Sequence, residues 1–146
     1  METVIEVRNL VKRYDDLVAV NGIDLDVNAG EVYSILGPNG AGKTTSVEIM
    51  ECLRKKTSGE VHILGHDIER GQKEIRKRIG VLPQSFNAFD YLPVKEHIEY
   101  FGGLFDKRIP AEELIEAVQL QDKRDAWFIN LSGGLKPRVG GAIAMV

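Results

Sequence analysis

Polar and apolar residues alternate along much of the first half of the chain, and this pattern predicts strands with one exposed face. The alternation is clearest over residues 23–27 and 60–64, and residues 5–7 show a shorter version of it. A period of two is typical of an antiparallel sheet with one wet face. Residues 32–36 instead form an almost continuous apolar run, which predicts a buried, parallel strand, and residues 79–82 predict a further strand.

Four other segments are predicted to be helical. Residues 44–54 follow a glycine-rich loop with apolar residues at helical spacing, and residues 73–78 predict a short helix. After Pro93 the spacing is helical over residues 94–105. Pro110 and the two glutamates near it then open another helix, because proline and acidic residues favour the first turn. A mixed αβ region is therefore followed by a helical region.

Composition and charge narrow the range of functions. The chain has 146 residues, 43% of them hydrophobic, and a formal net charge of −3. That charge argues against nonspecific nucleic-acid binding, which needs a basic surface. Cys52 is the one cysteine, so no intrachain disulfide can form, and this favours a cytosolic protein. No signal peptide is visible and no apolar stretch approaches the roughly 20 residues that cross a bilayer, so a membrane role is expected to come through a partner.

A phosphate-binding motif follows the predicted buried strand. The pattern is G-x-x-x-x-G-K-[ST], and the residues that fill it are Gly37, Pro38, Asn39, Gly40, Ala41, Gly42, Lys43 and Thr44. Glycines let successive backbone N–H groups point inward as an anion-binding nest, and the next helix adds its positive N-terminal end. Lys43 is expected to reach the β- and γ-phosphates, Thr44 to bind Mg²⁺ and Thr45 to support a phosphate. A strand before the loop and a helix after it favour a nucleotide site over a flexible turn.

Three further segments narrow the class of nucleotide-binding protein. Tyr14 ends Val-Lys-Arg-Tyr, Gln84 ends Val-Leu-Pro-Gln, and Leu131 opens Leu-Ser-Gly-Gly near the C-terminus. Together with the phosphate loop, at family-like spacings along the whole chain, they resemble the ATP-binding domain of ABC transporters. The resemblance implies an α/β fold, namely a P-loop NTPase core with an N-terminal antiparallel β subdomain and an α-helical subdomain.

Under this resemblance, residues 1–146 are a partial ABC-type ATP-binding domain that lacks the C-terminal part of the core. The αβ nucleotide-binding part is expected over about residues 1–90, and the helical signature subdomain over about residues 91–146. The implied cofactors are ATP and Mg²⁺.

The resemblance also implies roles for individual residues. Tyr14 matches the aromatic residue that stacks on the adenine ring, and its π-face suits a base. Gln84 matches the glutamine that meets Mg²⁺ and the attacking water and relays to the membrane partner, so it is both the catalytic candidate and a metal candidate. Ser132, Gly133 and Gly134 match the signature that binds the nucleotide of a second protomer, with the two glycines opening a helix toward the γ-phosphate.

The implied partners are transmembrane permease subunits and a second ATP-binding domain in a head-to-tail dimer. Residues 91–105 match the surface of the helical subdomain that faces the membrane subunits. The single-domain layout resembles exporter-type ATP-binding subunits. The expected location is cytoplasmic, on the inner face of the cell membrane through that membrane partner, and no nucleic-acid partner is expected.

The C-terminal end departs from the family pattern. The family continues with a strand ending in Asp-Glu and, later, a histidine, whereas the last acidic residue among residues 1–146 is Asp125. The carboxylates that hold Mg²⁺ and activate water are therefore expected to be missing, and the strand at residues 32–36 to have an exposed edge. Pro137 stands where the family usually has glutamine. Either a helix begins near Ser132 with Pro137 disturbing its second turn, or the helix begins later with Pro137 in its first turn.

The sequence leaves two functions open. The first is the ATP-binding subunit of an ABC transporter, which couples ATP binding and hydrolysis to transport and is inactive as residues 1–146 alone. The second is a non-catalytic ATP-binding fragment, or an ABC-type protein without a transport role. A natural truncation, a decayed gene product and a fragment all fit the pattern. No Asn-Lys-x-Asp motif occurs, which argues against a small GTPase.

Overall fold

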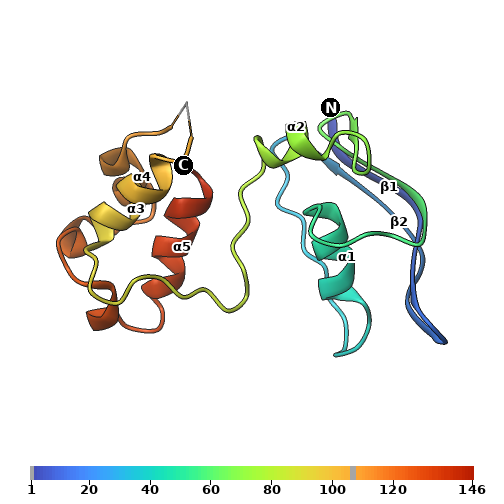
Figure 1. The fold of residues 1–146 in the computed structure, drawn as a ribbon, viewed down its shortest axis with the longest axis horizontal. Coiled ribbons are helices and arrows are strands. Elements are labelled where there is room, and N and C mark those ends of the chain that lie inside the picture. Colours follow the sequence, from blue (N-terminus) through green and yellow to red (C-terminus); the bar gives the residue numbers. More distant parts are fainter. Residues whose placement is uncertain (1, 106–107) are drawn as a thin grey trace. The chain divides into compact units, whose positions relative to one another are not determined.

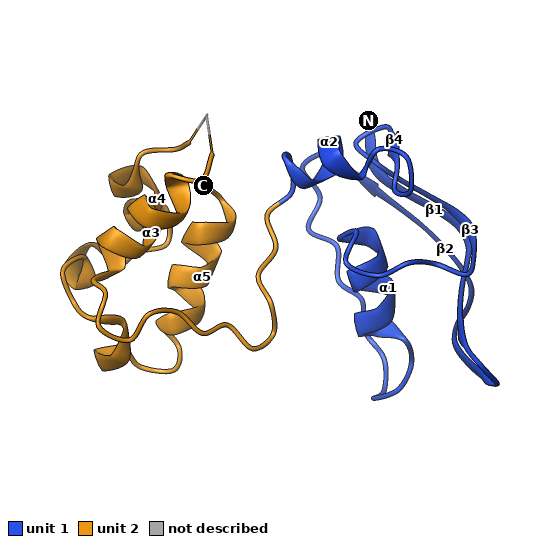
Figure 2. Cartoon of the chain, viewed as in Figure 1, with its two compact units in different colours: residues 1–79 blue, residues 80–146 orange. Residues whose placement is uncertain are grey.

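The chain folds into two compact units, Met1–Ile79 and Gly80–Val146, shown in different colours in Figure 2. This computed structural model describes residues 2–105 and 108–146. Each unit has its own buried core and is described by itself.

Unit 1 is built on an antiparallel sheet of four strands (Figure 1). The strands are β1 (Thr3–Tyr14), β2 (Leu17–Asn28), β3 (Ser58–Ile63) and β4 (His66–Asp67). Their order in the sheet is β2-β1-β3-β4, and every neighbouring pair is antiparallel. The alternating pattern therefore predicted the sheet type correctly, although β1 is longer than the sequence indicated.

Two short helices complete unit 1. Helix α1 (Lys43–Met50) follows the glycine-rich loop, and helix α2 (Gln72–Arg76) follows β4. Val7 on β1, Ile49 on α1 and Ile75 on α2 are all fully buried in one hydrophobic core. Burial of apolar side chains from the strands and both helices is what holds α1 on the sheet, because a helix of this length is not stable by itself.

Two predicted strands are not formed. Residues 32–36 and 79–82 have no regular secondary structure, and the side chains of Val32 and Leu36 are 97% and 89% exposed. A strand needs a neighbour that accepts and donates its backbone hydrogen bonds. In the described part of the chain neither segment joins the sheet β2-β1-β3-β4. The prediction that these two segments are strands was wrong, and so was the prediction that the strand at residues 32–36 is buried.

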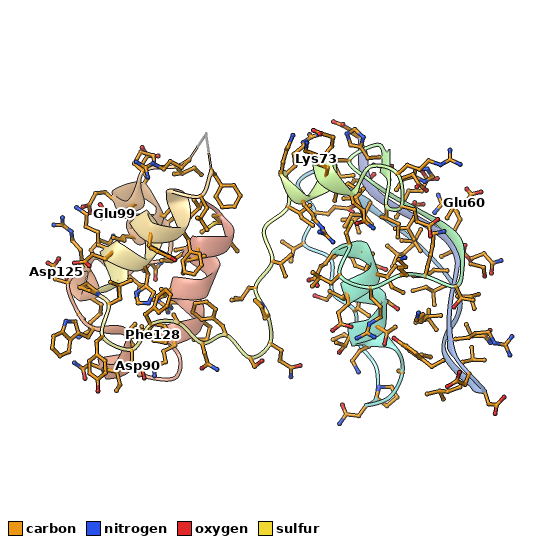
Figure 3. All side chains as sticks on the ribbon, viewed as in Figure 1. Glu60, Lys73, Asp90, Glu99, Asp125 and Phe128 are labelled. Atoms are coloured by element: carbon orange, nitrogen blue, oxygen red, sulfur yellow. The ribbon has the colours of Figure 1, made fainter. Side chains whose placement is uncertain are left out.

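Unit 2 is helical, as the spacing after Pro93 predicted. Its helices are α3 (Val94–Gly102), α4 (Ala111–Ala117) and α5 (Lys136–Ala144), with two short 3₁₀ helices, η1 (Gln121–Lys123) and η2 (Phe128–Asn130). Apolar residues from each of the three α-helices fill one core, and Phe128 of η2 lies buried inside it (Figure 3).

A buried histidine fixes the segment that leads into α3. His97 is fully buried. Its Nδ1 lies 3.0 Å from the carbonyl of Pro93, and its Nε2 accepts a hydrogen bond from the backbone N–H of Phe89 at 3.1 Å. One side chain thus satisfies two backbone groups beside the core.

The segment before α3 also packs on α5. Leu82 and Phe86 lie against Gly140 in the middle of α5, and an added Cβ at Gly140 would meet Leu82 and come within 3.0 Å of Phe86. An added Cβ at Gly141, in contrast, would meet no atom within 4 Å. Glycine at position 140 therefore admits a close approach that any larger residue would obstruct, whereas the glycine at 141 serves no such contact.

These two adjacent glycines give a matched pair of substitutions. Gly141→Ala is expected to raise the free energy of unfolding by about 0.5–1 kcal/mol, because alanine favours helix. Gly140→Ala is expected to lower it by about 1 kcal/mol or more, because overpacking outweighs that gain. Urea unfolding followed by circular dichroism measures both. Equal stabilisation by the two variants would show that Leu82 and Phe86 do not depend on Gly140.

Candidate functional site

The phosphate-binding motif forms a loop that ends at the first residue of α1. Gly40 and Gly42 have φ angles of 83° and 79°, a left-handed backbone that glycine adopts without steric cost. Gly42 is the residue before the helix, and its carbonyl accepts hydrogen bonds from the backbone N–H of Ser46 at 2.8 Å and from the Ser46 hydroxyl at 2.9 Å. The start of α1 is thus fixed at Lys43.

The loop is held against strand β2. A Cβ at Gly42 would collide with the carbonyl oxygen of Ala19 and lie 3.1 Å from Val20. A Cβ at Gly40 would meet nothing. Position 42 therefore requires glycine for two reasons, the left-handed conformation and the close approach of β2, while position 40 requires it for the first alone.

Lys43 bends back over the loop. Its ammonium donates hydrogen bonds to the carbonyls of Gly37 at 2.7 Å and Pro38 at 2.6 Å. The charge therefore lies over the same loop whose glycines the sequence singled out. The first backbone N–H groups of a helix have no partner within the helix, so those at the start of α1 add partial positive charge beside this ammonium.

The two threonines of the first turn differ in accessibility. Thr44 is exposed and Thr45 is partly buried. An exposed hydroxyl oxygen one residue after Lys43 is a hard ligand of the type that Mg²⁺ accepts beside phosphate oxygens. Among the described residues there is no group of three or more His, Cys, Asp or Glu side chains that could hold a metal ion.

Tyr14 lies in unit 1 at the end of β1, and 36% of it is exposed. Its hydroxyl accepts a hydrogen bond from Nη1 of Arg54 at 2.6 Å. An arginine side chain stays protonated in proteins, so this group is a cation, and a hydrogen bond to Glu48 raises the pKa of its guanidinium further above the ordinary value. Sequence analysis did not single out Arg54, because a basic residue after a helix is common on protein surfaces.

The remaining site candidates lie in unit 2. Gln84 is exposed in an irregular segment, and Ser132, Gly133 and Gly134 form an exposed turn. Gln84 and Gly133 line the same cavity of about 380 Å³, together with Leu82, Pro83, Ser85, Phe86, Lys136 and Pro137. Within this unit the structure thus brings the candidate glutamine together with one of the signature glycines, Gly133.

The signature turn differs from the sequence expectation in one respect. Gly133 and Gly134 do not open the helix, because α5 begins at Lys136 with Pro137 in its first turn. The carbonyl of Ser132 accepts the N–H groups of Leu135 at 3.0 Å and Lys136 at 3.2 Å, which forms a turn before the helix. Of the two alternatives for Pro137, the later helix start is correct, since proline is tolerated where its missing N–H would have no partner.

The loop, its left-handed glycines and the helix that follows define a P-loop protein of the nucleotide-binding class. The chain belongs to the ABC transporter ATP-binding family, because the family model described as "ABC transporter" matches residues 20–146. ATP binding is a property of that family. In the described residues no helix is both long and apolar enough to cross a membrane.

Curated relatives cover nearly the whole chain. The Nod factor export ATP-binding protein I of Burkholderia lata is 37% identical over 97% of this chain and 48% of that protein. The daunorubicin resistance ATP-binding protein DrrA3 of Streptomyces coeruleorubidus is 36% identical over 99% of this chain and 48% of its own length. The chain therefore spans about half the length of these relatives.

Solved structures share the fold. The ATP-binding cassette MJ0796, in a dimeric post-hydrolysis state bound to ADP and Pi, is 28% identical with a TM-score of 0.80, over 97% of this chain and 68% of that one. The cbiO1 protein of Clostridium perfringens, part of the ABC transporter complex cbiONQ, is 25% identical with a TM-score of 0.80, over 99% of this chain and 61% of that one. The fold expected from the sequence is thereby confirmed.

The two loop glycines predict different costs of substitution. Gly40→Ala is expected to lower the free energy of unfolding by about 1 kcal/mol, the cost of a left-handed alanine. Gly42→Ala adds a collision with the backbone of β2 and is expected to cost at least about 2 kcal/mol. Chemical denaturation of both variants measures the difference. The contact between the loop and β2 would be refuted by equal losses.

Proposed function

We propose that this chain is the ATP-binding part of an ABC transporter, and that the loop at residues 37–45 holds the triphosphate of ATP. The observation that carries this proposal is the position of the Lys43 ammonium, 2.7 and 2.6 Å from two loop carbonyls at the N-terminus of α1. Phosphate oxygens that enter the loop would accept from this cation and from the free backbone N–H groups beside it. Both features would bind anions in general. Membership of the ABC transporter family is what indicates that the anion is a nucleotide.

The triphosphate would be bound with Mg²⁺. The exposed hydroxyl of Thr44 suits this ion as one ligand, and Mg²⁺ commonly takes its other ligands from phosphates and waters. Gln84 is the second proposed ligand and the proposed contact to the attacking water, because its amide both donates and accepts. Thr45 is proposed to support a phosphate from the same turn.

The base would lie on Tyr14. This ring is partly exposed at the end of β1, and its hydroxyl is anchored by Arg54. An aromatic face that is held in place can stack on adenine without reading its edges.

The membrane role is proposed from the family and the relatives. ATP hydrolysis would be coupled to transport, with permease subunits as partners and a peripheral location on the inner face of the membrane. Ser132, Gly133 and Gly134 are proposed to contact the nucleotide of a second ATP-binding domain in a head-to-tail dimer. The exposed turn that they form is accessible to such a partner, and relatives named for export or drug resistance favour an exporter.

Lys43→Ala is expected to weaken ATP binding about 10- to 100-fold, since a charge-assisted contact to phosphate is removed from the loop. Titration with a fluorescent ATP analogue measures the affinity. Lys55→Ala, which removes an exposed lysine outside the loop, is the matched control and is expected to bind normally. Unchanged affinity in Lys43→Ala would refute the phosphate-loop assignment.

Binding of ATP by residues 1–146 is separate from its hydrolysis by the same residues, and the two can be tested apart. Residues 1–146 contain no acidic side chain after Asp125, so they include no carboxylate at the position where the family activates water. We expect the 146-residue chain taken alone to bind Mg-ATP and to release no phosphate above background. A phosphate-release assay tests this. Turnover that disappears in Lys43→Ala would show that these residues suffice for catalysis.

A further inference from the structure

Arg54 connects the base-stacking candidate to the helix of the phosphate loop. It lies four residues beyond the end of α1, and its side chain reaches the end of β1. Nη1 of Arg54 donates to the hydroxyl of Tyr14 at 2.6 Å, a distance expected for a strong, charge-assisted hydrogen bond. These two residues are 40 positions apart in the sequence.

The same guanidinium is anchored on α1. Nε of Arg54 donates to Oε2 of Glu48 at 2.7 Å, and the backbone N–H groups of Leu53 and Arg54 donate to the carbonyl of Glu48 at 2.9 and 3.1 Å. The chain after α1 therefore folds back on Glu48 and aims the Arg54 side chain at Tyr14. A rigid planar fork can hold a carboxylate and a hydroxyl at once, which a single ammonium cannot do with the same geometry.

Lys12 covers part of the same ring. Its ammonium lies 4.7 Å from the centroid of the Tyr14 ring, and the guanidinium carbon of Arg54 lies 5.7 Å from it. Cations near an aromatic face are attracted by its quadrupole. The ring is thus restrained at its hydroxyl by Arg54 and at its face by Lys12, although it stands at the exposed end of a strand.

We propose that Arg54 is a positioning residue that fixes Tyr14 for adenine and connects the base site to helix α1, whose first turn forms the phosphate site. Restraint before binding matters because a mobile ring must lose its freedom when it stacks on the base. The inference rests on the proposed ATP function and adds to it a contact that reaches the base site from α1. Arg54 acts through Tyr14 and touches no phosphate.

Two probes separate the base site from the phosphate site. Binding of ATP and of inorganic tripolyphosphate to the purified protein is measured by calorimetry. Arg54→Met is expected to weaken ATP binding about five-fold, the size of one net hydrogen bond, and to leave tripolyphosphate binding unchanged. Arg54→Lys is expected to behave like Arg54→Met because it lacks the fork. Lys55→Met, which removes the neighbouring exposed cation, is the matched control and should leave ATP binding unchanged.

Tyr14→Phe tests the same contact from the other end, without disturbing the ion pair of Arg54 with Glu48. It is expected to weaken ATP binding as much as Arg54→Met, and the double variant should show no further loss, because both changes remove one interaction. Additive losses, or an equal loss of ATP and tripolyphosphate binding in Arg54→Met, would overturn the inference.

Tyr14→Ala distinguishes failure of the inference from failure of the base assignment. It is expected to weaken ATP binding at least about five-fold through lost stacking, with tripolyphosphate binding unchanged. If Tyr14→Ala weakens ATP binding and Arg54→Met does not, the role of Arg54 is refuted and the base site stands. If Tyr14→Ala has no effect, Tyr14 does not bind the base, and the proposed role of Arg54 is refuted as well.

Discussion

The candidate nucleotide site depends on one close contact, that of Gly42 with the backbone of β2. This contact leaves no room for a Cβ beside the carbonyl of Ala19, and Gly42 takes a left-handed conformation there. Because Gly42 is the residue before α1, the same contact sets where the helix starts and hence where Lys43 and the free N–H groups lie. The sheet thus determines the position of the phosphate-binding charges, although none of its own side chains belongs to the loop.

The sequence predicted those parts of the fold that depend on local pattern. The alternation over residues 23–27 predicted an antiparallel strand, because one face of β2 packs on the core and the other is wet. The P-loop motif predicted where α1 begins, because its glycines encode a required backbone conformation. The prediction of a strand from the apolar run at residues 32–36 was wrong for a physical reason. Apolar composition indicates that a segment can be buried, but a strand exists only beside another strand, and the described chain places none there.

The site was predicted less completely than the fold. The sequence proposed Tyr14 as a site residue but did not indicate its contact with Arg54, because that contact spans 40 positions and no periodicity relates the two residues. It likewise left the start of the last helix open, since Pro137 fits either a disturbed second turn or a regular first one. The structure answers that question: α5 begins at Lys136, so Pro137 lies in its first turn. The buried residues Val139 and Gly140 follow inside the helix.

Lys43 shows why binding at such a loop is an exchange rather than a simple gain. Its ammonium already donates to two carbonyls at 2.7 and 2.6 Å, so a triphosphate must compete with them. A phosphate oxygen carries formal negative charge and a carbonyl only a partial one, which favours the phosphate. The net gain is smaller than the full strength of the new contact, because the two carbonyl contacts are weakened or lost. The backbone N–H groups at the start of α1 have no such internal partner, so they contribute to anion binding without that loss.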